Sequence, residues 1–228
     1  MFLVANYFLW NYPRSAQTLA SPFQICEDYA QGDHLWIWVK RVAGLKAKVI
    51  YWDQRLDDAA TETVALTFDG TDYRVAEKMH KTMPIDKGMM SQKFKHAALK
   101  YEVGMSTQTK RCVWIHGPVR GGLNDKTLMQ QSKVLDKIKE GKLAVVDRGY
   151  INHQLKDKLT WPNSHHDPAT NNYLSRLRLR QETFHGRLKQ YAILKETFRH
   201  NTDLHRFAME AVAVLTQYDM DNGHPLFT

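Results

Sequence analysis

The sequence has few cysteines and no apolar run long enough to span a membrane. Only Cys26 and Cys112 occur among 228 residues, and they stand far apart without a C-x-x-C pattern. This spacing indicates neither a cysteine-based zinc site nor a disulfide framework, and two isolated thiols fit a reducing compartment. The run MFLVANYFLW (residues 1–10) lacks a basic leader and a small-residue cleavage site. Since it is too short to cross a bilayer, we expect it to form the first turns of a core-packing helix.

Repeats and low-complexity tracts are also absent, so one folded domain with a small appendage fits the length of the chain. The hydrophobic share of 43%, with six Trp, ten Tyr and nine Phe, indicates a substantial core. Lys plus Arg exceed Asp plus Glu by 32 to 24, which gives a net charge of +8. This excess is compatible with a polyanionic partner, but it also occurs in proteins that have none.

Residues 1–50 are predicted to be helical. After a turn at Gln31-Gly32, apolar residues recur at helical spacing: Leu35, Trp38, Val39, Val42 and Leu45. Two short helices around such a turn resemble a helix-turn-helix, although a plain helical cap is the commoner arrangement. We expect this N-terminal subdomain, with a remnant helix-turn-helix as one reading, to end near residue 50.

The sequence pattern then changes to one that is typical of short strands. Residues 64–68 and 73–76 predict two strands of a hairpin, joined by a tight turn at Asp69-Gly70-Thr71-Asp72. Further predicted elements follow in chain order: strands at 100–107 and 112–115, a helix from about 124 to 139, a strand at 143–146, a polar surface loop at 151–173, a long helix from 174 to about 200, and a last helix at 204–218. Strands followed by alternating strand and helix predict an α/β fold with a mixed sheet flanked by helices.

Three acids stand where a site built on a sheet and a helix needs them. Asp69 ends the first predicted strand, Asp147 ends the strand after the middle helix, and Glu182 lies on the long helix. Clustered carboxylates repel one another, and divalent cations are the usual compensation. Two Mg²⁺ or Mn²⁺ ions roughly 4 Å apart hold the attacking water and the leaving oxygen of a phosphodiester in line.

Each acid also has a purely structural interpretation. Asp69, before a glycine, could cap the hairpin turn. Asp147 could form a turn or pair with Arg148, and Glu182 follows Arg178 by four residues, the spacing of a weak helical ion pair. None of the three is convincing alone.

Five motifs give the acids a common context. They are FDGTD at 68–72, KYEVG at 100–104, HGPVRGGLND at 116–125, VVDRGY at 145–150, and R-x-x-x-E-x-x-x-G-x-L-K at 178–189. By these motifs, the chain resembles the DDE-superfamily endonucleases, the transposase-type catalytic domain of the PIF/Harbinger kind. The interval from Asp147 to Glu182, 182 − 147 = 35 positions, also fits. The resemblance extends from about Val49 to the DNGHPLF tail.

The resemblance implies that residues 51–228 form an RNase H-like endonuclease domain. Asp69, Asp147 and Glu182 would be its catalytic triad and would bind two Mg²⁺ or Mn²⁺ ions. Asp125 matches a further characteristic Asp of the family; it either steers metal or substrate, or caps the helix that follows, and we favour the cap. The implied reaction is hydrolysis of a DNA phosphodiester to leave a 3′-hydroxyl, with strand transfer as an optional second step.

The long helix is basic. Residues 174–206 hold eight Lys and Arg against three Asp and Glu, a local net of 8 − 3 = +5. Arg178, Glu182, His185 and Lys189 share one helical face, on which cations beside a metal carboxylate could grip a DNA backbone. The DNA-binding candidates are Arg178, Lys189, Arg187 and Arg148. A solvated basic face is the alternative, and His165-His166-Asp167 indicates a surface loop more than a metal site.

The chain departs from the family pattern in two respects. His185 and Tyr191 stand where Asn and Trp are commoner, and intact transposases of this kind carry a longer N-terminal region with a DNA-binding module. We expect that the helical cap serves this purpose, or that the module is missing or supplied by a separate DNA-binding protein. The resemblance places the protein in the nucleus with DNA as its partner; a homodimer stays open, and we expect no membrane.

Two other functions remain open. A domesticated or truncated derivative would bind DNA or protein partners without cleavage. A metal-dependent phosphatase with a small substrate fits the acids but not the basic long helix.

Overall fold

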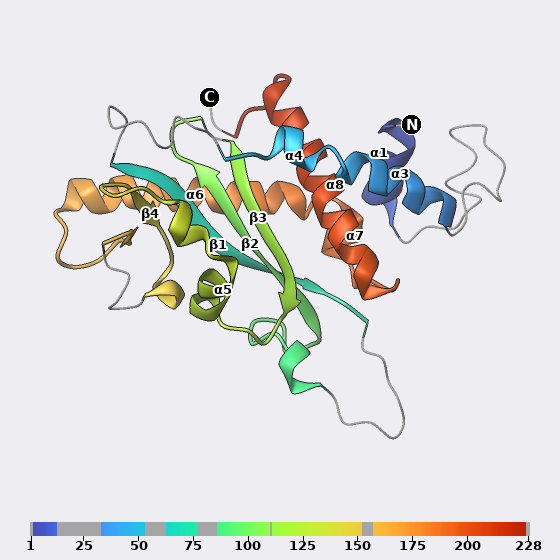
Figure 1. Cartoon of the computed structure of the whole chain (residues 1–228), viewed down its shortest axis with the longest axis horizontal. Coiled ribbons are helices and arrows are strands. Elements are labelled where there is room, and N and C mark those ends of the chain that lie inside the picture. The colour runs from blue at the N-terminus through green and yellow to red at the C-terminus, as the bar shows by residue number, and fades with distance from the viewer. Residues whose placement is uncertain are drawn as a thin grey trace.

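Five strands form one mixed sheet in this computed structural model, in the spatial order β3-β2-β1-β4-β5 (Figure 1). The strands are β1 (Val64–Arg74), β2 (Ala98–Ser106), β3 (Cys112–Arg120), β4 (Leu143–Val145) and β5 (Leu159–Thr160). β2 runs antiparallel to β1 and β3, whereas β4 runs parallel to β1 and β5. The predicted α/β fold class is confirmed, and the mixed sheet with its flanking helices is compatible with the RNase H-like fold.

The structure describes residues 2–12, 33–52, 63–76, 86–109, 111–151 and 157–226. The turn predicted at Gln31-Gly32 lies outside these residues, so the helix-turn-helix interpretation stays a prediction. The domain boundary near residue 50 also stays a prediction. In the described part of the chain, no helix combines the length and the apolarity that a membrane span requires.

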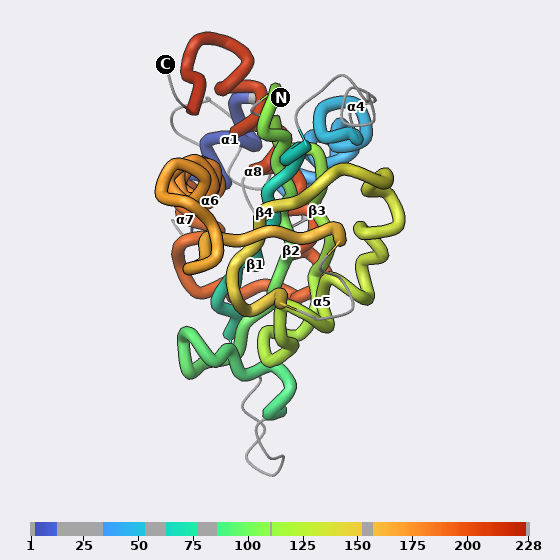
Figure 2. Tube along the Cα trace, turned by 90° about the vertical axis from the view of Figure 1, so that its left-hand side faces the viewer, coloured from blue at the N-terminus to red at the C-terminus, as the bar shows by residue number. Residues whose placement is uncertain are grey.

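The helices are α1 (Phe2–Asn11), α3 (Asp33–Ala43), α4 (Lys46–Val49), α5 (Asp125–Ser132), α6 (Pro168–Leu188), α7 (Ala192–Lys195) and α8 (Thr202–Asp221). The described residues also form the 3₁₀ turns η4 (Lys87–Met89), η5 (Val134–Lys137) and η6 (Arg148–Tyr150). α6 crosses one face of the sheet and α5 lies against the other (Figure 2). Side chains of β1 around Asp69 therefore face either the side of α6 or the side of α5.

The predicted core-packing role of the first apolar run is confirmed. The run forms α1, which buries Ala5, Phe8 and Leu9 in a cluster shared with α3, α8 and the α6 side of the sheet. A second cluster fills the other face, where Phe68 of β1 packs with Met129 of α5. The two clusters hold the sheet from both sides.

The predicted hairpin at Asp69–Asp72 is wrong. β1 is one continuous strand that pairs with β2 from Leu66↔Ser106 to Arg74↔Ala98, with Gly70 opposite Glu102. The Asp-Gly signal is local, and the long partner strand overrides it because pairing with β2 continues through the whole segment, from Leu66 to Arg74.

Three helix boundaries also differ from those predicted. α6 begins inside the predicted loop, because Asp167 accepts hydrogen bonds from Ala169 N and Thr170 N and Pro168 occupies the first turn. It ends at Leu188, before the separate short helix α7. The middle helix breaks at Lys133, whose φ of 55° stops α5 before the 3₁₀ turn η5 begins.

Candidate functional site

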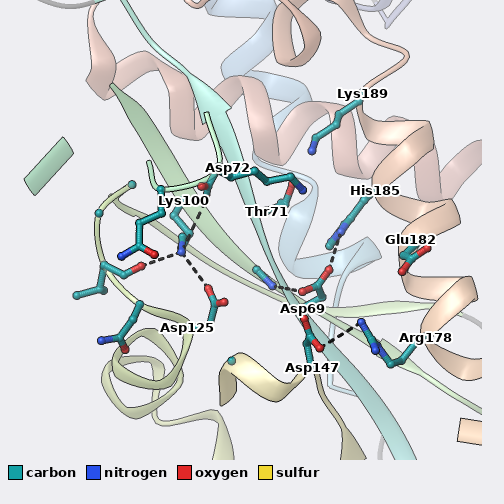
Figure 3. A pocket seen from close by; sticks show the side chains of 18 of the residues that line it. Asp69, Thr71, Asp72, Lys100, Asp125, Asp147, Arg178, Glu182, His185 and Lys189 are labelled. Carbon is teal, nitrogen blue, oxygen red and sulfur yellow. Dashed lines mark hydrogen bonds and ion pairs between the residues drawn. The ribbon is translucent and has the colours of Figure 1, made fainter. Parts of the chain in front are cut away.

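The three predicted acids lie around one pocket of about 690 Å³ (Figure 3). Thr67 of β1 pairs with Val145 of β4, and Asp69 and Asp147 each follow this pair by two residues. Since side chains alternate along an extended chain, both acids face the same side of the sheet as Thr67. Glu182 enters the same pocket from α6. Three separate elements thus bring together carboxylates that are far apart in the sequence.

Gln181, the neighbour of Glu182, fixes α6 against the sheet. Its Oε1 accepts a hydrogen bond from Thr67 Oγ1 at 2.6 Å, and its Nε2 donates to Val103 O at 3.0 Å. The side chain is buried, with 2% of its surface exposed. These bonds also fix the position of Glu182 relative to β1, because the two residues are adjacent on α6.

Asp69 is held by its neighbours on both sides. Its Oδ1 accepts from Gly70 N at 2.8 Å, and its Oδ2 lies 3.4 Å from His185 Nδ1. His185 Nε2 lies 3.2 Å from Gln181 Nε2. Because an amide nitrogen only donates, a neutral imidazole with its proton on Nδ1 satisfies both contacts.

Asp147 combines a structural contact with its place in the pocket. Its Oδ1 accepts from Arg148 N at 2.6 Å and caps η6, so the predicted turn alternative is present in the structure. Its Oδ1 also lies 3.4 Å from Arg178 Nη2. Arg178 therefore pairs with Asp147, which follows β4, and within the described residues Glu182 forms no ion pair.

A hollow of about 10 Å³ lies between the three acids and Arg178. Such a volume is about that of one water-sized sphere, and carboxylate oxygens are the ligands that hard divalent cations prefer. In the described part of the chain, no three His, Cys, Asp or Glu side chains are close enough to hold an ion in this conformation. The three carboxylates are thus chemically suited to a divalent cation. In this conformation, however, Arg178 contacts Asp147 and His185 contacts Asp69.

Cations share the pocket with the acids. Arg178, Glu182, His185 and Lys189 all line it, as one helical face predicts. Lys189 points into the pocket (Figure 3), and its ammonium lies 5.6 Å from the ring centroid of Tyr73. Burial lowers the pKa of Lys189, and the charge of Lys93 adds to this effect. The pocket therefore combines its acids with a basic rim, formed by Lys93, Arg178 and Lys189.

The other two DNA-binding candidates lie elsewhere. Arg187 donates to Pro225 O at 2.7 Å and to His224 O, which ties α6 to the C-terminal segment. Arg148 is exposed on η6, beside Asp147 and outside the pocket lining. Contact of either residue with DNA stays a prediction.

A sequence model described as DDE superfamily endonuclease matches residues 68–217, more than half of the chain. The chain belongs to this family. The match begins one residue before Asp69 and contains Asp125, Asp147 and Glu182, and it confirms the superfamily that the motifs predicted. Among curated proteins, none matches the chain.

In this DDE superfamily endonuclease, the prediction that Asp125 caps α5 is wrong. The cap is Asn124, whose side chain accepts from Thr127 N at 2.7 Å. Asn and Asp are about equally good caps, so the sequence Asn-Asp leaves the choice open by one position. Asp125 is instead the first residue of α5, and it lines the pocket.

Lys100 is a residue of the site that the sequence did not indicate. Its Nζ donates to Leu123 O at 2.7 Å and to Asp125 Oδ1 at 2.9 Å, and lies 3.8 Å from Asp72 Oδ1. The signal was the opposite charge of Asp72 and Lys100, which face each other in the register of β1 and β2. That signal is readable only once the strands are known to pair.

Proposed function

We propose that this endonuclease hydrolyses DNA phosphodiesters with divalent metal ions, as a transposase-type nuclease of the PIF/Harbinger kind. The observation that supports it is the convergence of Asp69, Asp147 and Glu182, from β1, the end of β4 and α6, on one small hollow. In the proposed reaction, water adds to phosphorus, the P–O3′ bond breaks, and the products carry a 3′-hydroxyl and a 5′-phosphate. Strand transfer by that hydroxyl would be a second step.

Asp69, Asp147 and Glu182 are the residues that would hold two Mg²⁺ or Mn²⁺ ions. Bound ions activate a water molecule and neutralise charge on the reacting phosphate. His185 presents its Nδ1–H to Asp69 and orients that carboxylate. Arg178 contacts Asp147 and competes with a cation for its oxygen.

The basic rim gives DNA a place to lie. Lys93, Lys189 and Arg178 line the pocket that holds the acids. Among the described residues, neither Lys93 nor Lys189 forms an ion pair. Cations in this position attract the phosphates that flank the reacting bond. We further propose a nuclear protein that relies on a separate DNA-binding protein or on a second copy of this chain for target recognition.

Cleavage of labelled duplex DNA in Mg²⁺ or Mn²⁺ tests the proposal. Asp147→Asn keeps the size of the side chain and removes its charge. Asp136→Asn is the matched control, because Asp136 is exposed on η5 and does not line the pocket. The wild type and the control should cut, whereas the Asp147 variant should not; equal cleavage by all three would contradict the proposal.

A second function has an observation in its favour. Two of the three acids contact cationic or N–H-bearing side chains, Asp147 with Arg178 and Asp69 with His185. A derivative that binds DNA or protein without cutting would keep these contacts permanently. Salt-dependent DNA binding without cleavage in any divalent metal would favour this alternative.

A further inference from the structure

Asp125 lies on the face of the sheet opposite the Asp69 side chain. Asp69 faces α6, and the next residue, Gly70, faces α5 because side chains alternate along a strand. A Cβ atom added to Gly70 would lie 2.7 Å from Asp125 Oδ1. A Cβ atom added to Gly149 would lie 3.1 Å from Asp125 Oδ2. Each oxygen of this carboxylate therefore packs against the backbone of one glycine.

The two glycines belong to the segments that carry the predicted metal ligands. Gly70 follows Asp69 directly, and Gly149 follows Asp147 by two residues. The carboxylate of Asp125 thus fills the space between the end of β4 and the adjoining part of β1. A methyl group at Gly70 would displace the carboxylate, whereas one at Gly149 would require it to shift by only a few tenths of an ångström.

Lys100 holds this carboxylate in place. The distance of 2.9 Å from its Nζ to Asp125 Oδ1 is that of a charge-assisted hydrogen bond, and only 12% of the Lys100 side chain is exposed. The same ammonium donates to Leu123 O, which fixes the loop before α5. Asp125 is therefore compensated by a lysine on its own face of the sheet.

Lys100 also links Asp125 to the basic rim of the pocket. Asp72, 3.8 Å from Lys100, accepts a hydrogen bond of 2.5 Å from Ser91 Oγ. Ser91 Oγ in turn accepts from the backbone N–H groups of Lys93 and Phe94, both at 3.2 Å. A single polar network thus connects β1, β2, the start of α5 and the turn that carries Lys93.

We propose that Asp125, held by Lys100, is a positioning residue that spaces Gly70 from Gly149 and thereby fixes the separation of Asp69 and Asp147. The proposal rests on the proposed function, because it assigns that separation a role in metal binding. A positioning role differs from a ligand role, in which the carboxylate of Asp125 would itself bind the metal ions. Two metal ions tolerate only small errors in ligand position, of about 0.5 Å.

Amide hydrogen exchange without metal tests the spacer directly. Asp125→Ala removes the carboxylate, and exchange in segments 68–72 and 145–150 should rise by about tenfold, the effect of losing one charge-assisted bond. Lys100→Met should raise exchange in the same segments, whereas Asp125→Asn, which keeps the size and an oxygen, should stay within about twofold of the wild type. Unchanged exchange in Asp125→Ala would overturn the proposal.

A second pair of variants guards against a folding defect in Asp125→Ala. Gly70→Ala places a methyl group against Asp125 Oδ1, so exchange should rise; in Gly70→Ala/Asp125→Ala the space is free, and exchange should fall back. A double variant that exchanges as fast as Gly70→Ala or faster would contradict direct spacing.

Mn²⁺ titration by calorimetry separates spacing from ligation. Asp125→Asn should keep the wild-type affinity within about twofold, while Asp147→Asn should lose about tenfold or more. An equal loss in both variants would make Asp125 a ligand and overturn the proposal. If the wild type binds no Mn²⁺, the proposed function fails, but the exchange result still decides whether Asp125 is a spacer.

Discussion

Arg178 of α6 crosses the pocket to Asp147 at the end of β4, with its Nη2 3.4 Å from the carboxylate oxygen Oδ1. This contact joins the helix that carries one predicted metal ligand to the strand that carries another. Under the proposed function, a metal ion and the guanidinium would compete for the same oxygen of Asp147. The pair is partly exposed, with 36% of the Arg178 side chain accessible, so this competition would be modest.

Replacement of Arg178 should therefore separate metal binding from DNA binding. Arg178→Met keeps an apolar stem and removes the charge, and we expect Mn²⁺ to bind about three- to fivefold more tightly while DNA binding weakens. Calorimetry and a salt series of DNA binding measure the two effects. Arg176→Met is the matched control on the exposed side of α6, and an Arg178 variant that behaves like it would contradict the competition.

Glu102 should make stability depend on pH. It is fully buried in β2, and burial raises the pKa of this carboxyl to about 7, although a hydrogen bond from Trp114 acts in the opposite direction. Trp114 Nε1 donates to its Oε2 at 3.1 Å, while within the described residues Oε1 has no hydrogen-bond partner.

The folded state holds the Glu102 proton more tightly than the unfolded chain, whose pKa is 4.5. The contribution of the protonated form is therefore complete below pH 4.5 and is lost as the pH rises towards about 7. Glu102→Gln should raise the free energy of unfolding at pH 8 by about 1–3 kcal/mol and have little such effect at pH 4.5. Urea titrations at both values measure this, with exposed Glu140→Gln as control; a difference that does not vary with pH would refute it.

Gln181→Leu should destabilise the fold by about 2–3 kcal/mol, because Thr67 Oγ1 and Val103 O lose a buried partner. The midpoint of urea unfolding measures the change. Gln130→Leu, at an exposed position of α5, should leave the midpoint nearly unchanged. Equal midpoints for the two variants would show that α6 is not fixed through Gln181.

Replacement of Gly104 and of Gly186 by alanine should change the stability of the fold in opposite directions. At Gly104, a Cβ atom would lie 2.4 Å from Phe68 Cε1, so Gly104→Ala should cost about 1–3 kcal/mol. At Gly186 in α6, a Cβ atom meets nothing within 4 Å, and Gly186→Ala should gain about 0.5–1 kcal/mol. Thermal unfolding of the two variants checks the signs, and a stabilising Gly104→Ala would contradict the packing of β1 on β2.

The sequence predicted what local pattern determines. The apolar run at the N-terminus gave α1, and the periodic face of residues 178–189 placed Arg178, Glu182, His185 and Lys189 on one pocket. The motifs predicted the superfamily, and the alternation of strand and helix patterns predicted the mixed sheet.

Features that depend on partners distant in the sequence escaped prediction. The hairpin at Asp69–Asp72 failed because the competing partner, β2, begins at Ala98. Lys100 was not predicted because its contacts depend on Asp125 and on the strand register. The cap of α5 was misplaced by one residue because Asn and Asp are about equally good helix caps. These contacts follow from the fold, and so does the place of the Asp125 carboxylate between Gly70 and Gly149.

The most direct measurement of the central claim is anomalous X-ray scattering at the manganese edge from crystals grown with Mn²⁺ and a short DNA duplex. The account predicts two peaks about 4 Å apart, in contact with the carboxylates of Asp69, Asp147 and Glu182. No peak in this hollow at saturating Mn²⁺, or peaks held by other residues, would contradict it.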